Sequence, residues 1–108
     1  GIVFALRTRL GLATNVRRFV GAGPTAGLDI TVVRENSEGA YFSPGEVVHA
    51  GEAEEAAVQT VTTSRIAVER SVRHAFTLAA EGRRELVVAH KVRVLTASGG
   101  VWTRVAEE

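Results

Sequence analysis

Hydrophobic residues recur every three or four positions in two stretches of the chain, which is the spacing of one face of an α-helix. The first stretch predicts a helix over residues 2–10 that ends at Gly11. The second predicts the most regular helix, from Ser64 to Ala80, with Gly82 closing it. Five residues of this second helix are expected on the face toward the core: Ile66, Val72, Ala75, Phe76 and Ala79.

Runs of β-branched and apolar residues around these helices predict extended segments. They cover residues 12–20 and 28–35, and residues 85–95 read as a buried strand. The stretch from 46 to 64 is weakly patterned, and its second half, 57–64, favours a strand over a helix. A short final helix carries Val101, Trp102 and Val105.

The order of strand, long helix and strand favours an α/β fold. We expect a single domain over residues 1–108, built in two layers from a short mixed sheet with helices packed on it. A chain of this length can bury only a modest core, and a partner subunit often completes the burial at this size. The length of the chain therefore makes an oligomer an expectation.

Glycine residues mark two predicted loops in the chain. The segment from Gly21 to Gly27 lacks the Lys-Ser or Lys-Thr ending of a phosphate-binding loop, and its spacing does not match a dinucleotide fingerprint. It is predicted to be a plain loop rather than a phosphate site. A second turn is predicted from Gly39 to Gly45.

Charge and cysteine content exclude several classes of protein. Thirteen basic and twelve acidic residues nearly cancel, so no overall field attracts nucleic acid or an anionic membrane. No apolar stretch is long enough to span a bilayer. The absence of cysteine removes thiol chemistry and fits a reducing compartment, so we expect a cytoplasmic protein with no nucleic acid or membrane partner.

Lysine and tyrosine each occur once in the chain, and both follow apolar runs. Lys91 is the only lysine beside twelve arginines, and Tyr41 is the only tyrosine, seven residues after Arg34. An amine can lose its proton, whereas a guanidinium stays charged. Lys91 is therefore a candidate for proton transfer.

Four segments carry a resemblance to a known family. They read LRTRLGLATNVRR, VVRENSEGAYF, ERSVRHAF and HKVRVL…GGVW, in this order along the chain. Their order and spacing resemble the smaller domain of the isocitrate and isopropylmalate dehydrogenases, the β-decarboxylating dehydrogenases. The resemblance covers essentially the whole chain.

The resemblance implies a site for a malate-like acid. Arg7, Arg17 and Arg34 stand at the positions of the family's carboxylate-binding arginines, and a guanidinium can make two parallel hydrogen bonds to a carboxylate. Tyr41 matches the tyrosine that acts near the carbon losing CO2. Lys91 matches the lysine that the other subunit contributes to handle the hydroxyl proton.

Further positions follow from the same resemblance. Val3 and Phe4 lie where the family selects the substrate's side chain, and they indicate an apolar substituent. Arg93 replaces an asparagine that lies near the nicotinamide, so it could bind another carboxylate or phosphate instead. Arg18 replaces a proline.

The resemblance also implies what the chain lacks. The aspartates that hold Mg²⁺ or Mn²⁺ and the segment that grips adenosine lie outside the matched segments. We therefore expect no cofactor in this chain, with NAD and Mg²⁺ or Mn²⁺ present only if the chain is a fragment of a full enzyme. Because the family's small domain dimerises through helices and a strand pair, the candidates for the twofold interface are Phe76, Trp102 and residues 47–62.

Three functions remain open from the sequence. The favoured one is a stand-alone dimer that binds a small carboxylate or acyl-chain substrate and performs acid–base chemistry without a nicotinamide: decarboxylation, carbon–carbon cleavage or isomerisation. The second is a non-catalytic dimerisation or ligand-binding module. The third is a fragment of an NAD- and Mg²⁺-dependent 2-hydroxy-acid dehydrogenase.

Simpler explanations exist for single residues. In a chain rich in arginine, an arginine is by default a solvated or surface-paired side chain, and a lone tyrosine in a turn is usually a rim residue. His90 is expected to be packed and hydrogen-bonded rather than a ligand. His49 and His74 are too scattered to predict a metal site.

Overall fold

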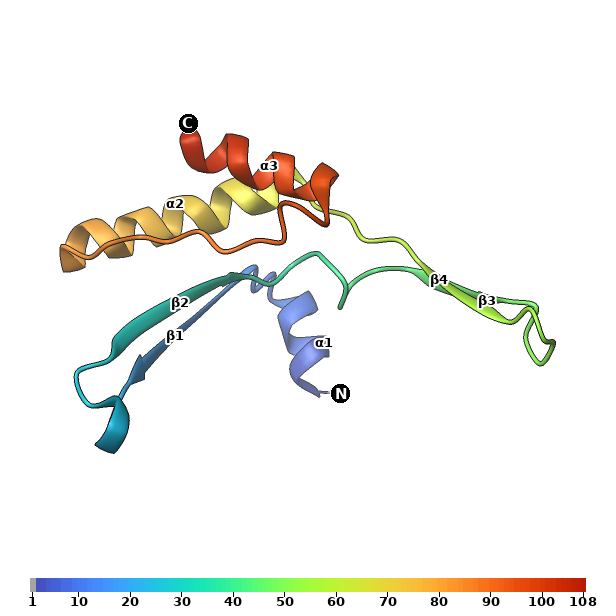
Figure 1. The fold of residues 1–108 in the computed structure, drawn as a ribbon, viewed down its shortest axis with the longest axis horizontal. Helices are drawn as coiled ribbons and strands as arrows, with labels where there is room; N and C mark the ends of the chain where they lie inside the picture. Colours follow the sequence, from blue (N-terminus) through green and yellow to red (C-terminus); the bar gives the residue numbers. More distant parts are fainter. Residues whose placement is uncertain (1) are drawn as a thin grey trace.

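The computed structural model describes residues 2–108, apart from the side chain of Phe4. Figure 1 shows three helices and two separate strand pairs. The elements in chain order are α1 (Ile2–Arg9), β1 (Thr14–Val20), the 3-10 turn η1 (Gly23–Thr25), β2 (Asp29–Glu35), β3 (Gly45–Val48), β4 (Ala56–Gln59), α2 (Arg65–Gly82) and α3 (Thr96–Glu107). The predicted α/β class is confirmed.

The strands form two antiparallel pairs in place of the expected mixed sheet: β1 pairs with β2, and β3 pairs with β4. In the first pair the register runs from Thr14 opposite Glu35 to Val20 opposite Asp29. Alternate residues of β2 are half-buried and exposed, because successive side chains of a strand point to opposite faces. The half-buried face contacts α2, and the hydroxyl groups of Thr14 and Ser71 lie 3.2 Å apart across this contact.

The loop from Gly21 to Gly27 joins β1 to β2, as predicted. Its amides are used within the turn: the Gly21 N–H donates to the Leu28 carbonyl at 2.7 Å, and the Ala26 N–H donates to the Gly23 carbonyl at 3.0 Å. Donors consumed in this way are not presented to a phosphate.

α2 begins and ends close to the predicted residues. Ser64 caps its start, where the Ser64 hydroxyl accepts a hydrogen bond from the Ala67 N–H at 3.2 Å. At the other end Arg83 adopts the left-handed conformation with φ 49°. Gly82 is therefore the last helical residue rather than the residue that closes the helix.

The core lies between α2 and α3. Val68, Val72 and Val105 are buried together, and Val101 and Trp102 pack against them. The predicted buried face of α2 needs correction at two places, since Ile66 is 75% exposed and Phe76 is 50% exposed.

The reason for this correction is angular. The buried residues of α2 are Ala67, Val68, Ser71 and Val72. At 100° per residue, Ile66 lies on the opposite side of the helix from the centre of this stripe, and Phe76 lies on its flank. α3 packs on small side chains, so the two largest apolar residues of the prediction stay outside the contact.

The predicted strand over 85–95 is wrong. This segment runs extended beside α2 and leads into α3 (Figure 1), and it contains no strand. Within the described part of the chain, the N–H groups of residues 85–90 donate no backbone hydrogen bond. Val87 is 75% exposed and Val94 is 78% exposed. A strand requires a hydrogen-bonding neighbour, and neither strand pair reaches this segment.

The β3–β4 hairpin projects away from the other elements (Figure 1), and the molecule measures 55 × 35 × 32 Å. All but one of its strand residues are exposed. The strand predicted over 57–64 is confirmed only in its first part, since β4 ends at Gln59 and residues 60–63 are irregular. None of the helices in the described part of the chain is long and apolar enough to cross a membrane.

Candidate functional site

Two of the predicted arginines share the exposed face of the β1–β2 pair. Arg17 lies opposite Val32, and Arg34 lies opposite Asn15. Side chains two residues apart in a strand share a face, so Arg17 and Arg34 are diagonal neighbours, with backbones about 7–8 Å apart. Both are exposed, and the other face of the pair lies against α2. The antiparallel register thus brings together residues that are far apart in sequence.

Tyr41 adjoins this pair of arginines. The Arg34 guanidinium carbon lies 4.9 Å from the centre of the Tyr41 ring, within the range of a cation–π interaction. The Tyr41 side chain is 74% exposed. Arg34 and Tyr41, seven residues apart in sequence, are therefore in contact at the end of β2.

The loop that carries Tyr41 is tied to the start of α2. The Glu38 carboxylate accepts hydrogen bonds from the Ser64 N–H at 2.6 Å and from the Ser64 hydroxyl at 2.7 Å. The Gly39 N–H donates to the Thr62 carbonyl at 3.2 Å. Gly39 has φ 83°, a conformation that favours glycine. Tyr41 therefore follows a fixed turn rather than a free loop.

Glu35 fixes the same loop from the strand side. Its carboxylate accepts from the Ser37 N–H at 2.7 Å, from the Ser37 hydroxyl at 2.5 Å and from the Glu38 N–H at 3.2 Å. Arg70 of α2 donates to the Ser37 hydroxyl at 3.2 Å. Sequence reasoning missed Glu35 and Glu38 as supports of the site. The available signal was Ser64, a strong helix cap, although its partner Glu38 lies 26 positions away.

The predicted site cations lack carboxylate partners. Within residues 2–108, no ion pair joins a carboxylate to any of these residues: Arg7, Arg17, Arg34, Lys91 and Arg93. Carboxylates do hold four other arginines: Arg18, Arg65, Arg73 and Arg84. Arg9 and Arg83 are also unpaired in the described part of the chain, so the shared face distinguishes Arg17 and Arg34.

Arg18 points to the other face of the strand pair. Its guanidinium makes two hydrogen bonds to Asp29, at 2.8 and 2.9 Å, and Arg84 also donates to Asp29. The hydrogen bonds from Arg18 and Arg84 lower the pKa of the Asp29 carboxyl. This cluster joins the tip of the strand pair to the end of α2 and takes no part in the candidate site.

The predicted site residues at the start of the chain lie on α1. Arg7 is half-buried on α1, and Val3 is exposed on the same helix. α1 lies beside the end of the strand pair where β1 begins (Figure 1). Phe4 was predicted to contact the substrate, and its side chain lies outside the described residues.

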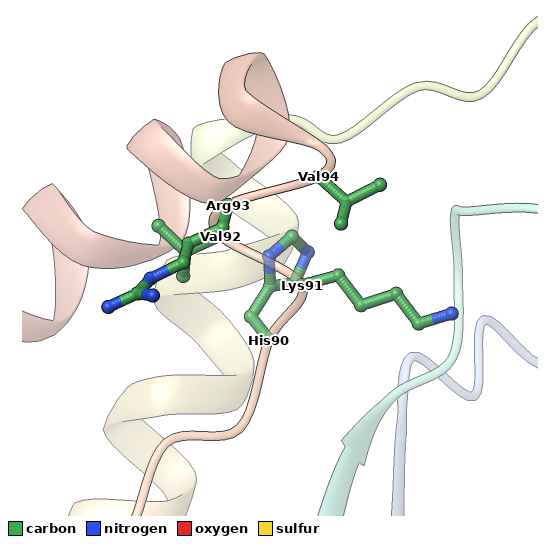
Figure 2. Close-up of a pocket in the computed structure, with 5 residues that line it drawn as sticks. All are labelled: His90, Lys91, Val92, Arg93 and Val94. Carbon is green, nitrogen blue, oxygen red and sulfur yellow. The ribbon is translucent and has the colours of Figure 1, made fainter.

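Lys91 and Arg93 lie on the segment that joins α2 to α3. Both line an open depression of about 550 Å³, together with His90, Val92 and Val94. Figure 2 shows the Lys91 side chain extending away from α2 and α3, while the Arg93 guanidinium lies on the opposite side of the segment. The two cations therefore do not converge on one ligand. Among the described residues, the Lys91 ammonium makes no hydrogen bond.

His90 is packed, as predicted, but not fully hydrogen-bonded. Its ring stacks on Trp102, with centroids 5.5 Å apart and an angle of 25° between the planes. Its Nδ1 is buried without a hydrogen-bond partner among the described residues. Within the same residues, no three His, Cys, Asp or Glu side chains are grouped so that they could hold a metal ion.

The chain belongs to the isocitrate/isopropylmalate dehydrogenase family, whose pattern it matches over residues 3–108. It is 42% identical to the 3-isopropylmalate dehydrogenase of Corynebacterium glutamicum strain R over 81 residues, which cover 75% of this chain and 24% of that relative. It is 39% identical to the 3-isopropylmalate dehydrogenase of Thermobifida fusca over 118 aligned residues, which cover all of this chain and 33% of that protein.

Solved structures agree with this assignment. The isocitrate dehydrogenase of Methylococcus capsulatus superposes with a TM-score of 0.88 and 27% identity, over 99% of this chain and 33% of that chain. The β-decarboxylating dehydrogenase of Thermococcus kodakarensis superposes with a TM-score of 0.73 and 34% identity, over 99% of this chain and 30% of that chain. The chain therefore spans a quarter to a third of the relatives described here.

Proposed function

We propose that this chain is the substrate-binding and proton-transferring part of a β-decarboxylating 2-hydroxy-acid dehydrogenase. The observation that carries the proposal is the shared exposed face of Arg17 and Arg34, with Tyr41 on the Arg34 guanidinium. Both cations lack carboxylate partners among the described residues and stand at diagonal positions on one face of the strand pair, where they can bind the carboxylates of one short acid. Membership of a family of dehydrogenases supports the reaction class.

Each residue has a defined part in this proposal. Arg17 and Arg34 bind the carboxylates of the substrate, because a planar guanidinium can make two charge-assisted hydrogen bonds to a carboxylate. Arg7, half-buried on α1, supplies a third positive charge. Tyr41 transfers a proton at the carbon that loses CO2, and Lys91 moves the proton of the substrate hydroxyl.

NAD and a divalent metal belong to the relatives' type of reaction, not to the described residues. Those residues group no metal ligands, and the loop from Gly21 to Gly27 uses its own amides internally. We therefore assign no step through either group. The nicotinamide-independent reaction that the sequence favoured gains no support, since the relatives are named as dehydrogenases.

A homodimer fits the same proposal. Lys91 and Arg93 point in opposite directions (Figure 2), and within the described part of the chain Lys91 makes no ion pair. In the family resemblance, this lysine serves the partner subunit's site. The β3–β4 hairpin projects without packing on the rest of the chain (Figure 1), and an isolated two-stranded hairpin is marginally stable. A second copy of the chain would cover it.

The test of substrate binding uses isothermal titration with 3-isopropylmalate and malate as probes. Arg34→Gln removes a charge from the shared face, and Arg83→Gln removes the same charge from the end of α2. Loss of charge-assisted hydrogen bonds worth ~1.5–3 kcal/mol predicts affinity lower by about tenfold to a hundredfold for Arg34→Gln. Arg83→Gln should bind as the unaltered chain does. Equal affinities for the two variants would refute the proposed site.

A further inference from the structure

The structure positions Lys91 through its backbone rather than through its side chain. The Lys91 ammonium has no hydrogen bond or ion pair within the described part of the chain. The preceding residues 85–90 have no ladder partner either, since their N–H groups donate no backbone hydrogen bond there. Whatever fixes the origin of this side chain must therefore act on the residues immediately around it.

A contact on the N-terminal side of Lys91 joins it to α3. The His90 ring stacks on Trp102, 5.5 Å between centroids (Figure 2 shows His90 beside Lys91). The His90 Nδ1 is buried without a hydrogen-bond partner among the described residues. The ring is therefore held by packing on Trp102, because no hydrogen bond to Nδ1 contributes.

A second contact lies on the C-terminal side. Gly99 of α3 is buried, and a Cβ atom placed there would lie 2.7 Å from the Val92 Cα and 3.1 Å from the Val92 carbonyl oxygen. Glycine is a poor residue for a helix interior, and the backbone of Gly99 is not in the left-handed region. The close approach of the Val92 backbone explains the glycine.

The turn between these contacts is closed by hydrogen bonds. The Lys91 carbonyl accepts from the Val94 N–H at 3.1 Å and from the Leu95 N–H at 2.8 Å, and the Leu95 carbonyl accepts from the Gly99 N–H at 2.7 Å. Lys91 is thus connected to α3 through a short, bonded turn. We infer that Trp102 and Gly99 of α3 are positioning residues for Lys91, acting through His90 and Val92.

This inference rests on the proposed function only for its biological meaning. It states where the Lys91 side chain begins and what holds it there. Another residue of α3, Val105, packs with Val68 and Val72 in the core against which Trp102 also lies. Val105→Ala therefore weakens this core without removing any of the residues that make the two contacts beside Lys91, and it controls for a general loosening of α3.

The single lysine provides the readout. Growth with lysine labelled at Cε gives one carbon–proton resonance, that of Lys91. Gly99→Ala and Trp102→Leu should shift or broaden this resonance, whereas Trp102→Phe, which keeps an aromatic ring, should stay close to the unaltered chain. Val105→Ala should lower the unfolding temperature without moving the resonance. Circular dichroism establishes that each variant is folded.

Two variants of His90 test the inference if Gly99→Ala does not fold. His90→Leu removes the ring that stacks on Trp102, and His90→Phe retains it, so only the first should move the Lys91 resonance. The inference is overturned if His90→Leu and Trp102→Leu leave the resonance where Val105→Ala leaves it. Failure of the proposed function would show instead as unchanged turnover in Lys91→Met, a result independent of this resonance.

Discussion

The guanidinium of Arg34 lies on the ring of Tyr41, with 4.9 Å between the guanidinium carbon and the ring centre. This contact joins Arg34, on the exposed face of β2 near its end, to the turn that follows the strand. Because both side chains are exposed, the contact orients each of them without burying either. The contact thereby brings together the arginine proposed to bind a carboxylate and the phenol proposed to transfer a proton.

Tyr41→Phe and Tyr41→Leu separate these two roles. Phe keeps the ring on Arg34 and removes the phenol, so carboxylate binding should be retained while the proton step is lost. Leu also removes an interaction worth ~0.5–1 kcal/mol at an exposed site, so affinity should fall by about twofold to fivefold. Titration with malate measures both variants, and equal affinities would show that the contact does not orient Arg34.

Glu38 and Ser64 should stabilise the fold as a pair. Ser64→Ala removes an N-cap, which costs about 1 kcal/mol, and Glu38→Gln removes the negative charge at the start of α2. Urea unfolding should show each variant less stable, and the double variant less destabilised than the two single changes added together. Glu54→Gln, exposed and without a partner in the described part of the chain, is the control. Strict additivity would contradict the pairing.

Asp29 should make the stability of the fold depend on pH. Hydrogen bonds from Arg18 and Arg84 lower its pKa in the folded chain, so the ionised form stabilises the fold. That contribution is complete above the ordinary aspartate value of about 3.9 and is lost as the pH falls through the lowered value. Asp29→Asn should therefore be less stable than the unaltered chain at neutral pH.

The difference between Asp29→Asn and the unaltered chain should narrow below about pH 4. Salt should narrow it too, because the group is exposed. Urea unfolding at a series of pH values measures it. Glu108, whose pKa is lowered by Arg65, should leave some acid sensitivity in the variant. A gap that stays constant through the acid range would argue against Asp29 as its source.

A charge on the projecting hairpin should weaken the dimer. Val47 of β3 is largely exposed and lies opposite Ala57 of β4, so Val47→Lys would place a charge in the contact between two copies. Sedimentation velocity should show monomer for Val47→Lys and dimer for Val20→Lys, which changes an exposed valine at the tip of the other strand pair. If both variants sediment alike, the hairpin does not form the interface.

Local patterns were sufficient for most of the elements. The helix start at Ser64, the loop from Gly21 to Gly27 and the strands on either side of it follow from caps, glycines and β-branched residues within a few positions. The shared face of Arg17 and Arg34 follows once the strand register is known. Sequence reasoning had these two residues from the family resemblance, without the register that places them together.

Long-range contacts explain what could not be predicted. Residues 85–95 have the composition of a strand, but a strand exists only where another strand offers hydrogen bonds. Ile66 and Phe76 were assigned to the core by hydrophobicity, while α3 packs on the smaller residues of α2. The hydrogen bond from Arg84 to Asp29 joins residues 55 positions apart. No sequence pattern within a few residues of either one predicts it.

The extended segment after α2 has a practical consequence for anyone who purifies this chain. Proteases bind their substrates as extended, accessible backbone, which is the state of residues 85–90. Arg83, Arg84 and Lys91 bracket this run with three cleavage positions for trypsin. A cut after Arg83 or Arg84 would break the chain between the arginine-bearing strands and Lys91, so brief digestion would leave the proposed acid–base lysine on a different polypeptide from the proposed carboxylate-binding arginines.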